Sequence, residues 1–226
     1  MEEPAEVLLD WPNQYRIIPS EFPPINFFEG LVDTDLMDEL YEIEAMTNER
    51  LRDEVGDITL VSQQDRLSGP GTSPVMAAFT HTSTACPSRF SDGSYGIYYA
   101  AKTLETAIEE TKHHRARFLS YTQEDAGEIE MRVYIGKIVK PFHDIRGTAY
   151  NTLHDPNDWQ PSQTFGQALK TKQAWGIVYR SVRAEGGECI AALRPPAITI
   201  PKQGPHLSYV WNGHSITHVY EKTLIG

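Results

Sequence analysis

Apolar residues recur at helical spacing in the first quarter of the chain. Asp33 or Thr34 can cap a helix there. The residues that follow form one apolar stripe: Leu36, Met37, Leu40, Ile43 and Met46. A second short helix can continue over residues 47–55 and end at Gly56. Because such a stripe must bury against another element, the pattern predicts helices that cover part of a core.

From Ile58 onward the pattern changes to short β-like runs. The runs ITLVS, VMAAFTH and YGIYYAA, bounded by Gly, Pro or Ser, predict strands over residues 58–62, 75–81 and 95–101. A further β-rich run covers residues 129–139. The pattern therefore favours a sheet built mainly from the later three quarters of the chain.

Two hairpins are indicated near the end of the chain. The first has a strand over residues 176–183 and a turn at residues 186–187, and the second turns at residues 212–213, an Asn-Gly pair. A short helix over residues 163–171 precedes them. Strands and helices of this kind predict an α+β core.

The chain divides into two expected parts. Residues 1–25 are rich in proline and acid and predict an extended arm over the domain surface. With the helices that follow, they make an expected N-terminal helical extension, residues 1–58, packed on a core domain, residues 59–226. A length of 226 residues with 40% hydrophobic composition suits one globular unit with such an elaboration.

The net charge of the chain limits the kinds of partner that it is expected to bind. The 20 Lys and Arg residues against 31 Asp and Glu residues give a formal net charge of -11, which disfavours nucleic acid as a partner. Acidic residues at the N-terminus do not suit a signal peptide, and no apolar run reaches membrane-spanning length. A cytoplasmic location away from membranes is therefore expected.

Metal-binding and disulfide patterns are weak in this sequence. Cys86 and Cys189 lie in unlike contexts without CxxC spacing, so both are expected to be ordinary thiols, with Cys189 buried. His214 and His218 are four apart in a predicted strand, which does not suit a zinc pair. We expect no metal site.

A capped helix presents a candidate carboxylate. Thr103 is a suitable N-cap, and one side of the helix gathers Leu104, Ala107, Ile108, Thr111 and Phe118. Glu110 falls at the edge of this apolar face, whereas Glu109 lies on the solvent face. His114 follows Glu110 by one turn and either holds it by an i,i+4 contact or has no special role.

Other polar residues allow both a structural and a functional interpretation. Arg66 opens a Gly/Pro-rich loop that either only turns the chain or directs a guanidinium at a phosphate. Arg89 and Tyr99 precede the capped helix and offer a cation and an aromatic floor. Ser181, in a predicted strand, either bonds a neighbour or faces a ligand.

These residues together resemble a known family. The motifs are Arg66 in DRLSG, Arg89 in SRFSDG, Tyr99 in YYAA, Glu110 closing TLETAIEE and Ser181 in GIVYRSVR. In this order and spacing the chain resembles the RES-domain toxins of RES/Xre bacterial toxin–antitoxin systems. The AAFTH, SRFSDG and GGECIAALRP segments are similar to the longer subgroup, which includes ParT-like toxins and carries an N-terminal extension.

The resemblance implies a fold like that of ADP-ribosyltransferases, a split mixed β-sheet core with flanking helices that clasps NAD+. It also implies cleavage of the bond between nicotinamide and ribose, with NAD+ as substrate. Glu110 would then stabilise an oxocarbenium-like ribose, and Tyr99 would stack on nicotinamide. Arg66 and Arg89 would hold the pyrophosphate or a ribose, and Ser181 would position the ribose or the carboxylate.

Three functions fit these residues. The first is an NAD+ glycohydrolase or phosphorylase that acts as a toxin by depleting NAD+. The second is a mono-ADP-ribosyltransferase that modifies a protein; it uses the same bond-cleaving residues, so the motifs suit both. The third is a non-catalytic binding module. The resemblance further implies an Xre-type antitoxin that blocks the cleft.

Overall fold

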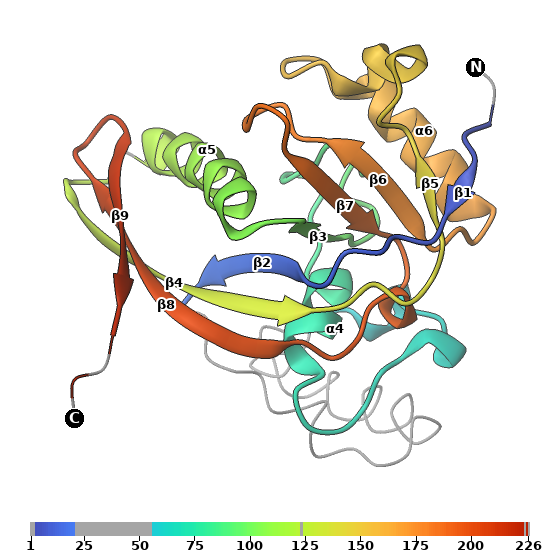
Figure 1. Cartoon of the computed structure of the whole chain (residues 1–226), viewed down its shortest axis with the longest axis horizontal. Coiled ribbons are helices and arrows are strands. Elements are labelled where there is room, and N and C mark those ends of the chain that lie inside the picture. Colours follow the sequence, from blue (N-terminus) through green and yellow to red (C-terminus); the bar gives the residue numbers. More distant parts are fainter. Residues whose placement is uncertain (1–2, 21–55, 123, 224, 226) are drawn as a thin grey trace.

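The computed structural model describes residues 3–20, 56–122, 124–223 and 225. Within them nine strands form one mixed sheet, in the order β1-β5-β6-β7-β3-β2-β4-β8-β9 (Figure 1). The strands are β1 (Glu6–Val7), β2 (Gln14–Pro19), β3 (Tyr98–Ala101), β4 (Gly127–Gly136), β5 (Phe142–Asp144), β6 (Gly176–Arg180), β7 (Glu188–Ala192), β8 (Lys202–Trp211) and β9 (Ile216–Lys222). Only β5 and β6 pair in parallel among these strands.

The sheet is narrowest between β3 and β2. Their register consists of one pair, Tyr15 with Ala101, whereas β2 pairs with β4 over its whole length. The sheet is therefore split into two halves that diverge on either side of this junction. The predicted α+β class, with a split mixed sheet and flanking helices, is confirmed.

Strand β2 corrects the expectation for the start of the chain. Residues 14–19 lie in the middle of the sheet instead of on the surface as an arm. The amide of Gln14 is fully buried and its Nε2 donates to the Tyr98 hydroxyl at 3.0 Å. The proline and acidic residues around this short apolar run are typical of a surface segment, so its burial was not predicted. The helices expected over residues 33–55 lie outside the described residues, so the division at residue 58 stays a prediction.

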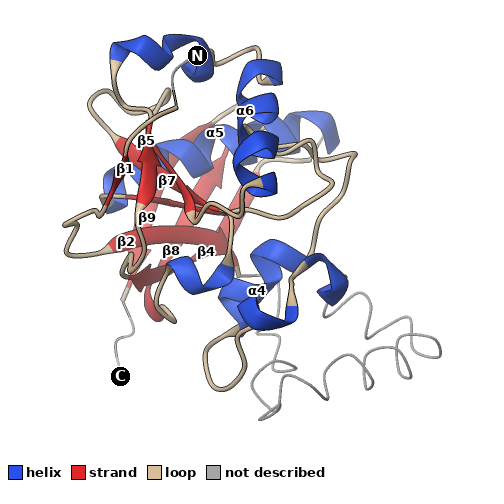
Figure 2. Ribbon diagram, turned by 90° about the vertical axis from the view of Figure 1, so that its right-hand side faces the viewer, coloured by secondary structure: helices blue, strands red, loops and turns tan. Residues whose placement is uncertain are grey.

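Three longer helices flank the sheet within the described residues: α4 (Ser73–Thr80), α5 (Leu104–Thr122) and α6 (Gln160–Thr171). Helices α5 and α6 pack on one face, in a core that includes Ala107 and Leu169, and α4 packs on the other (Figures 1 and 2). Alternation along β3 sends Tyr99 toward the α5 side and Tyr98 toward the α4 side. The two neighbouring tyrosines at the end of this strand therefore face opposite sides of the sheet.

Two predicted strands are wrong. Residues 75–81 belong mostly to α4, where Val75, Met76 and Phe79 bury one helical face behind a proline in the first turn. Residues 58–60 form a 3₁₀ turn, because the Asp57 carboxylate accepts from the backbone N–H and the hydroxyl of Thr59 at 3.0 and 2.5 Å. A side-chain cap at residues 58–60, and a proline in the first turn with one buried face in α4, favour helical turns over an extended conformation.

The later elements follow the predictions closely. Thr103 Oγ1 accepts from the backbone N–H of Thr106 at 3.2 Å at the start of α5, so the predicted cap is confirmed. Both hairpins form, as β6–β7 and β8–β9. Strand β6 ends at Arg180 and not at residue 183, so Ser181 opens the loop of residues 181–187.

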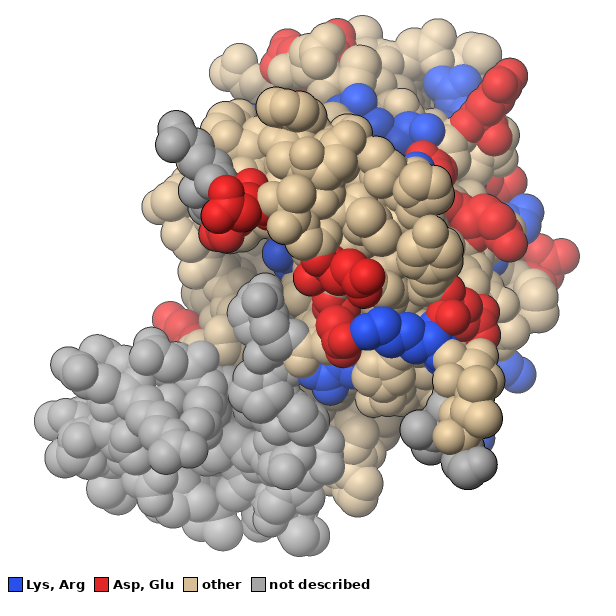
Figure 3. Space-filling model, turned by 90° about the vertical axis from the view of Figure 1, so that its left-hand side faces the viewer, with Lys and Arg blue, Asp and Glu red and all other residues tan. Residues whose placement is uncertain are grey.

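The described surface is mixed in charge. On the face shown in Figure 3, Lys and Arg side chains lie among Asp and Glu side chains, and no broad basic patch forms among the described residues there. Within the same part of the chain, no helix is long and apolar enough to cross a membrane.

Candidate functional site

A cavity of about 270 Å³ opens at the split in the sheet. Strands β2 and β3, helix α5 and the 181–187 loop all contribute to its lining. Glu110 is its acidic residue, and Arg16, Arg89 and Arg183 are its basic residues. The cavity thus joins side chains that lie up to about 170 positions apart in the sequence.

Glu110 is held at the cavity by the neighbouring loop. Its side chain is 18% exposed, against 46% for Glu109, which pairs with Lys112 instead. The predicted difference in orientation of the two glutamates is therefore confirmed. Ser181 Oγ donates to Glu110 Oε1 at 2.6 Å and itself accepts from the backbone N–H groups of Arg183 and Ala184 at 3.1 and 2.9 Å. These contacts fix the direction of the Ser181 proton.

Tyr99 forms a fixed wall of the cavity. Its hydroxyl bonds to Ser88 Oγ at 2.8 Å and accepts from the backbone N–H of Phe90 at 3.1 Å. Burial raises the pKa of Tyr99 to about 12, so the phenol stays neutral at neutral pH. The ring is thereby anchored by the turn that also carries Arg89.

The three cavity arginines make hydrogen bonds to backbone carbonyls and no ion pair within the described part of the chain. Arg16 donates to the backbone carbonyl of Tyr99 at 3.0 Å, and its Nε is buried without a hydrogen-bond partner. Arg89 donates to the carbonyls of Leu153 and Asp155 at 3.3 and 2.9 Å. Burial lowers the pKa of Arg16, as expected for a cation removed from water.

Arg183 completes the set by donating to the carbonyl of Pro156 at 3.2 Å. Carbonyl bonds orient a guanidinium without cancelling its charge. The cavity lining therefore holds three arginines against one carboxylate, Glu110, and this excess of positive charge suits an anionic ligand. Arg89 and Arg183 act electrostatically on the groups around Glu110, whereas the Arg16 guanidinium lies over the Tyr98 ring, 4.6 Å from its centroid.

Arg66 does not belong to this group. Its Nε donates to the carbonyl of Val61 at 3.0 Å, beside the ion pair of Asp65 with Arg194, and it does not line the cavity. The structure brings Arg89, Tyr99, Glu110 and Ser181 together and places Arg66 elsewhere. Sequence reasoning missed Arg16, for which the available signal was a charged residue inside the apolar run of residues 15–18.

His114 and Cys189 also face Glu110. His114 Nε2 lies 4.0 Å from Glu110 Oε2, and the Cys189 sulfur lies 3.9 Å from Oε1. Partial desolvation of the imidazole, whose side chain keeps 56% of its surface exposed, and then the positive charges of Arg183 and Arg89 lower the pKa of His114 to about 4. Burial raises the pKa of the Cys189 thiol, which is buried as expected. Both groups are therefore neutral at neutral pH.

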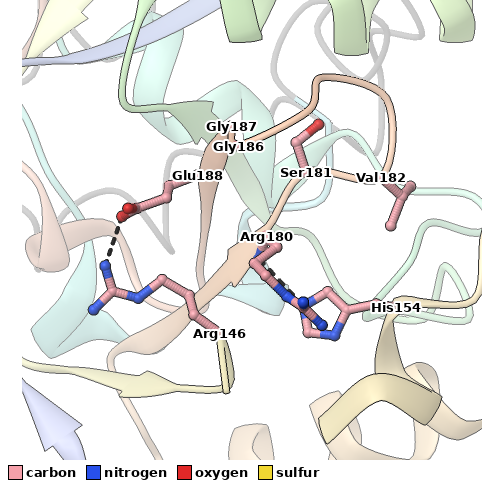
Figure 4. Close-up of a pocket in the computed structure, with 8 residues that line it drawn as sticks. All are labelled: Arg146, His154, Arg180, Ser181, Val182, Gly186, Gly187 and Glu188. Atoms are coloured by element: carbon pink, nitrogen blue, oxygen red, sulfur yellow. Dashed lines mark hydrogen bonds and ion pairs between the residues drawn. The ribbon is translucent and has the colours of Figure 1, made fainter. Parts of the chain in front are cut away.

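A second cavity, of about 610 Å³, lies on the other side of the 181–187 loop (Figure 4). Its Arg146 is paired with two carboxylates, at 2.7 Å to Asp144 and 2.6 Å to Glu188. Figure 4 shows the hydroxyl of Ser181 directed away from this pair. Arg180, which also lines this cavity, donates to Asn151 Oδ1 at 2.6 Å. We take the first cavity as the candidate site because it brings Glu110 together with Arg89 and Tyr99.

Metal binding has no evident location in the described residues, where no three His, Cys, Asp or Glu side chains form a group suited to a metal ion. His143 and His154, each followed by an aspartate in the sequence, bond to the backbone carbonyls of Pro4 and Tyr150 at 3.1 and 3.0 Å. They serve as hydrogen-bonding units of the backbone.

Comparisons with known proteins agree with the motifs. The chain is 31% identical over 214 residues to the uncharacterized protein y4oC of Sinorhizobium fredii (strain NGR234), covering 91% of this chain and 86% of that protein. The crystal structure of the M. tuberculosis MbcT-MbcA toxin-antitoxin complex matches 56% of this chain and 72% of its own, with 16% identity and a TM-score of 0.39, too low to carry an argument. Residues 64–212 match the RES domain, and the chain therefore belongs to the RES-domain family.

Proposed function

We propose that this protein cleaves NAD+ at the bond between nicotinamide and ribose. The observation that carries the proposal is the pairing, in one cavity, of a single held carboxylate with three arginines that lack a carboxylate partner among the described residues. NAD+ combines the two matching features, a cationic nicotinamide-ribose centre and an anionic pyrophosphate.

Glu110 would supply the electrostatic part of the reaction. As the C–N bond breaks, its electron pair leaves with nicotinamide, which departs neutral, and positive charge develops on the ribose. A carboxylate close to that charge stabilises the transition state more than the ground state, and the barrier to the reaction is therefore lowered. The hydrogen bond from Ser181 occupies Oε1 and leaves Oε2 of Glu110 toward the substrate.

The arginines would bind the pyrophosphate. Their planar guanidiniums can donate two parallel hydrogen bonds to a phosphate, and an excess of positive charge compensates the two negative charges of the ligand. Arg66 and Arg89 were expected to bind the anion together. Of Arg16 and Arg66, Arg16 lines the cavity and Arg66 does not, so Arg16 would bind the anion with Arg89. The anchored ring of Tyr99 would stack on the nicotinamide.

Membership of the RES-domain family supports a role as the toxin of a toxin–antitoxin system. Loss of NAD+ would harm the cell that makes the protein, so a partner must restrain it. We propose an Xre-type antitoxin that covers the cavity. Co-expression with such a partner should restore growth to cells that the wild-type chain inhibits.

The test compares two adjacent glutamates. Glu110→Gln keeps the shape of the side chain but removes its charge, and we expect NAD+ loss to fall at least about 100-fold, as for removal of a group that stabilises transition-state charge. Glu109→Gln is the matched control, because Glu109 points to solvent and pairs with Lys112. NAD+ loss and products are measured by mass spectrometry with purified protein.

Equal loss of activity in both glutamate variants would contradict the assignment of Glu110. No NAD+ loss by the wild-type protein, whether with buffer, inorganic phosphate or cell lysate, would contradict NAD+ cleavage and favour a binding module. Labelled ADP-ribose on a lysate protein would identify the activity as mono-ADP-ribosyl transfer.

A further inference from the structure

The groups around Glu110 also indicate how the second substrate is held. Resting on the proposed NAD+ cleavage, we propose that Glu110 Oε2 and His114 Nε2 form the subsite for the acceptor's hydroxyl oxygen, and that His114 takes the acceptor's proton. The acceptor would then be a neutral hydroxyl group, from water or from a protein side chain.

The two atoms have the right separation for this role. Nε2 and Oε2 lie 4.0 Å apart, too far for a direct hydrogen bond. One oxygen atom can lie at about 2.8 Å from both, which is an ordinary hydrogen-bond distance. Both side chains line the cavity from successive turns of α5, so the helix itself sets the gap.

Ser181 makes the arrangement asymmetric. Its proton is committed to Oε1 of Glu110, since its own oxygen already accepts two backbone N–H groups. Oε2 therefore remains to accept a hydrogen bond from another group. Water has two protons and could donate one to Oε2 and the other to His114. A side-chain hydroxyl has a single proton, which it would donate to His114, so its oxygen would lie beside Oε2 only at the moment of attack.

Charged and titratable groups reach His114 from three elements: Arg89 before β3, Arg183 in the 181–187 loop, and Glu110, His113, Arg115 and Arg117 on α5. Partial desolvation and the arginine charges lower the pKa of His114 to about 4. The imidazole is therefore neutral at neutral pH and can accept a proton at Nε2 when Nδ1 carries its hydrogen.

Substrate binding would strengthen this base. Arg183 and Arg89 lower the pKa of His114, and the same two arginines are proposed to bind the pyrophosphate. A bound anion compensates their charge, so the pKa of His114 should rise toward its ordinary value. His114 would thus become an effective base mainly when NAD+ is present.

The step balances as follows. The acceptor O–H bond breaks and its proton goes to Nε2, while the acceptor oxygen bonds to the anomeric carbon of the ribose. The C–N bond to nicotinamide breaks, and its electron pair leaves with neutral nicotinamide. His114 is 56% exposed, so it can return the proton to solvent. A phosphate dianion needs no general base, so the role proposed for His114 implies an acceptor that must lose a proton.

The first experiment compares His114→Gln with His113→Gln, its neighbour on the same helix. We expect His114→Gln to lower kcat roughly 100-fold or more, the usual contribution of a general base, and to leave KM for NAD+ within about threefold. The acidic limb of the kcat–pH profile should also disappear. Retention of wild-type kcat and pH profile by His114→Gln would overturn the proposal while leaving NAD+ cleavage intact.

A second experiment does not depend on activity. The His114 ring is titrated by NMR with and without inorganic pyrophosphate, and the exposed His218 on β9, outside the cavity lining, serves as the internal reference. We expect pyrophosphate to raise the pKa of His114 by more than half a unit. An unchanged pKa at saturating pyrophosphate would overturn the coupling between anion binding and the base.

Product analysis identifies the source of the hydroxyl. ADP-ribose in buffer indicates water, and ADP-ribosylated protein in lysate indicates a side chain; either supports the proposal if His114→Gln slows it. A phosphate ester of ADP-ribose as the main product in phosphate buffer would overturn it. Absence of any NAD+ loss by the wild-type protein would instead contradict the proposed function itself.

Discussion

Two cavities share the 181–187 loop, and their arginines are balanced in different ways. In the larger cavity, Arg146 lies between two carboxylates, those of Asp144 and Glu188, and Arg180 donates to Asn151 Oδ1. In the smaller one, Arg16 and Arg89 donate to backbone carbonyls and form no ion pair among the described residues. Burying a charge without an opposite charge is costly. The smaller cavity, which also holds Glu110, therefore has the features of a binding site, and the Arg146 cluster of the larger one has those of a structural contact.

The comparison also explains the position of Ser181. Tyr179 and Cys189 face the smaller cavity, whereas Arg180 and Glu188 belong to the opposite face of the hairpin. Ser181 follows the last strand residue, so its hydroxyl can turn to Glu110 while its backbone borders the larger cavity. Ser181 thus contacts both cavities, the larger one with its structural ion pairs and the smaller one with the proposed catalytic site.

Among the arginines of the two cavities, the largest effect should come from one without a carboxylate partner. Arg16→Lys replaces a planar fork by a point charge, and we expect kcat/KM for NAD+ to fall at least about tenfold. Arg89→Lys should act in the same direction. Arg66→Lys is the control, because Arg66 lies outside the cavity, and steady-state NAD+ consumption is the measurement. A larger loss in Arg66→Lys than in Arg16→Lys would reverse the assignment.

An intermediate effect, on stability, should come from the paired arginine. Arg146→Met leaves Asp144 without its ion-pair partner and Glu188 with Lys102 alone, so we expect the free energy of unfolding to fall by about 1–3 kcal/mol, with NAD+ turnover per folded molecule unchanged. Arg183→Met should do the opposite, lowering turnover and changing the free energy of unfolding by less than about 1 kcal/mol. Urea denaturation measures both. If Arg146→Met and Arg183→Met lowered the free energy of unfolding equally, the distinction between the two cavities would be contradicted.

The smallest effect concerns pH. The pKa of His114 is lowered in the folded state, so between about pH 6.5 and pH 4 the unfolded chain binds a proton that the folded chain does not. The free energy of unfolding should therefore fall as the pH falls through this range, and it should fall less in His114→Gln. An identical pH dependence of the two proteins in urea denaturation would show that His114 titrates normally.

Local sequence signals were enough to predict several parts of this molecule. The Thr103 cap and the apolar stripe of α5 lie within one segment, and helical phasing alone separated Glu110 from Glu109. Both hairpins were predicted because each turn lies next to the strands it joins. In such cases the physical causes are contained in a few neighbouring residues.

Long-range pairing decided the parts that were predicted wrongly. Residues 14–19 have a short apolar run with a charge inside it, and only their pairing with β3 and β4 makes them a central strand. Because that strand was assigned to the surface, Arg16 was missed. Arg66, named from the DRLSG motif, lies outside the cavity lining. The segment of α4 carries β-like residues, but its proline in the first turn and its burial on the sheet favour a helix.

The central position of β2 has a consequence for when the site can exist during synthesis. Residues 14–19 leave the ribosome early, but their partners in β3 and β4 follow only at residues 98–101 and 127–136. At about 5–20 residues per second, several seconds of translation separate the two. Arg16 cannot reach Tyr99 and Glu110 before then, and Ser181 comes later still. The nascent chain therefore lacks the assembled cleft until most of it has been made.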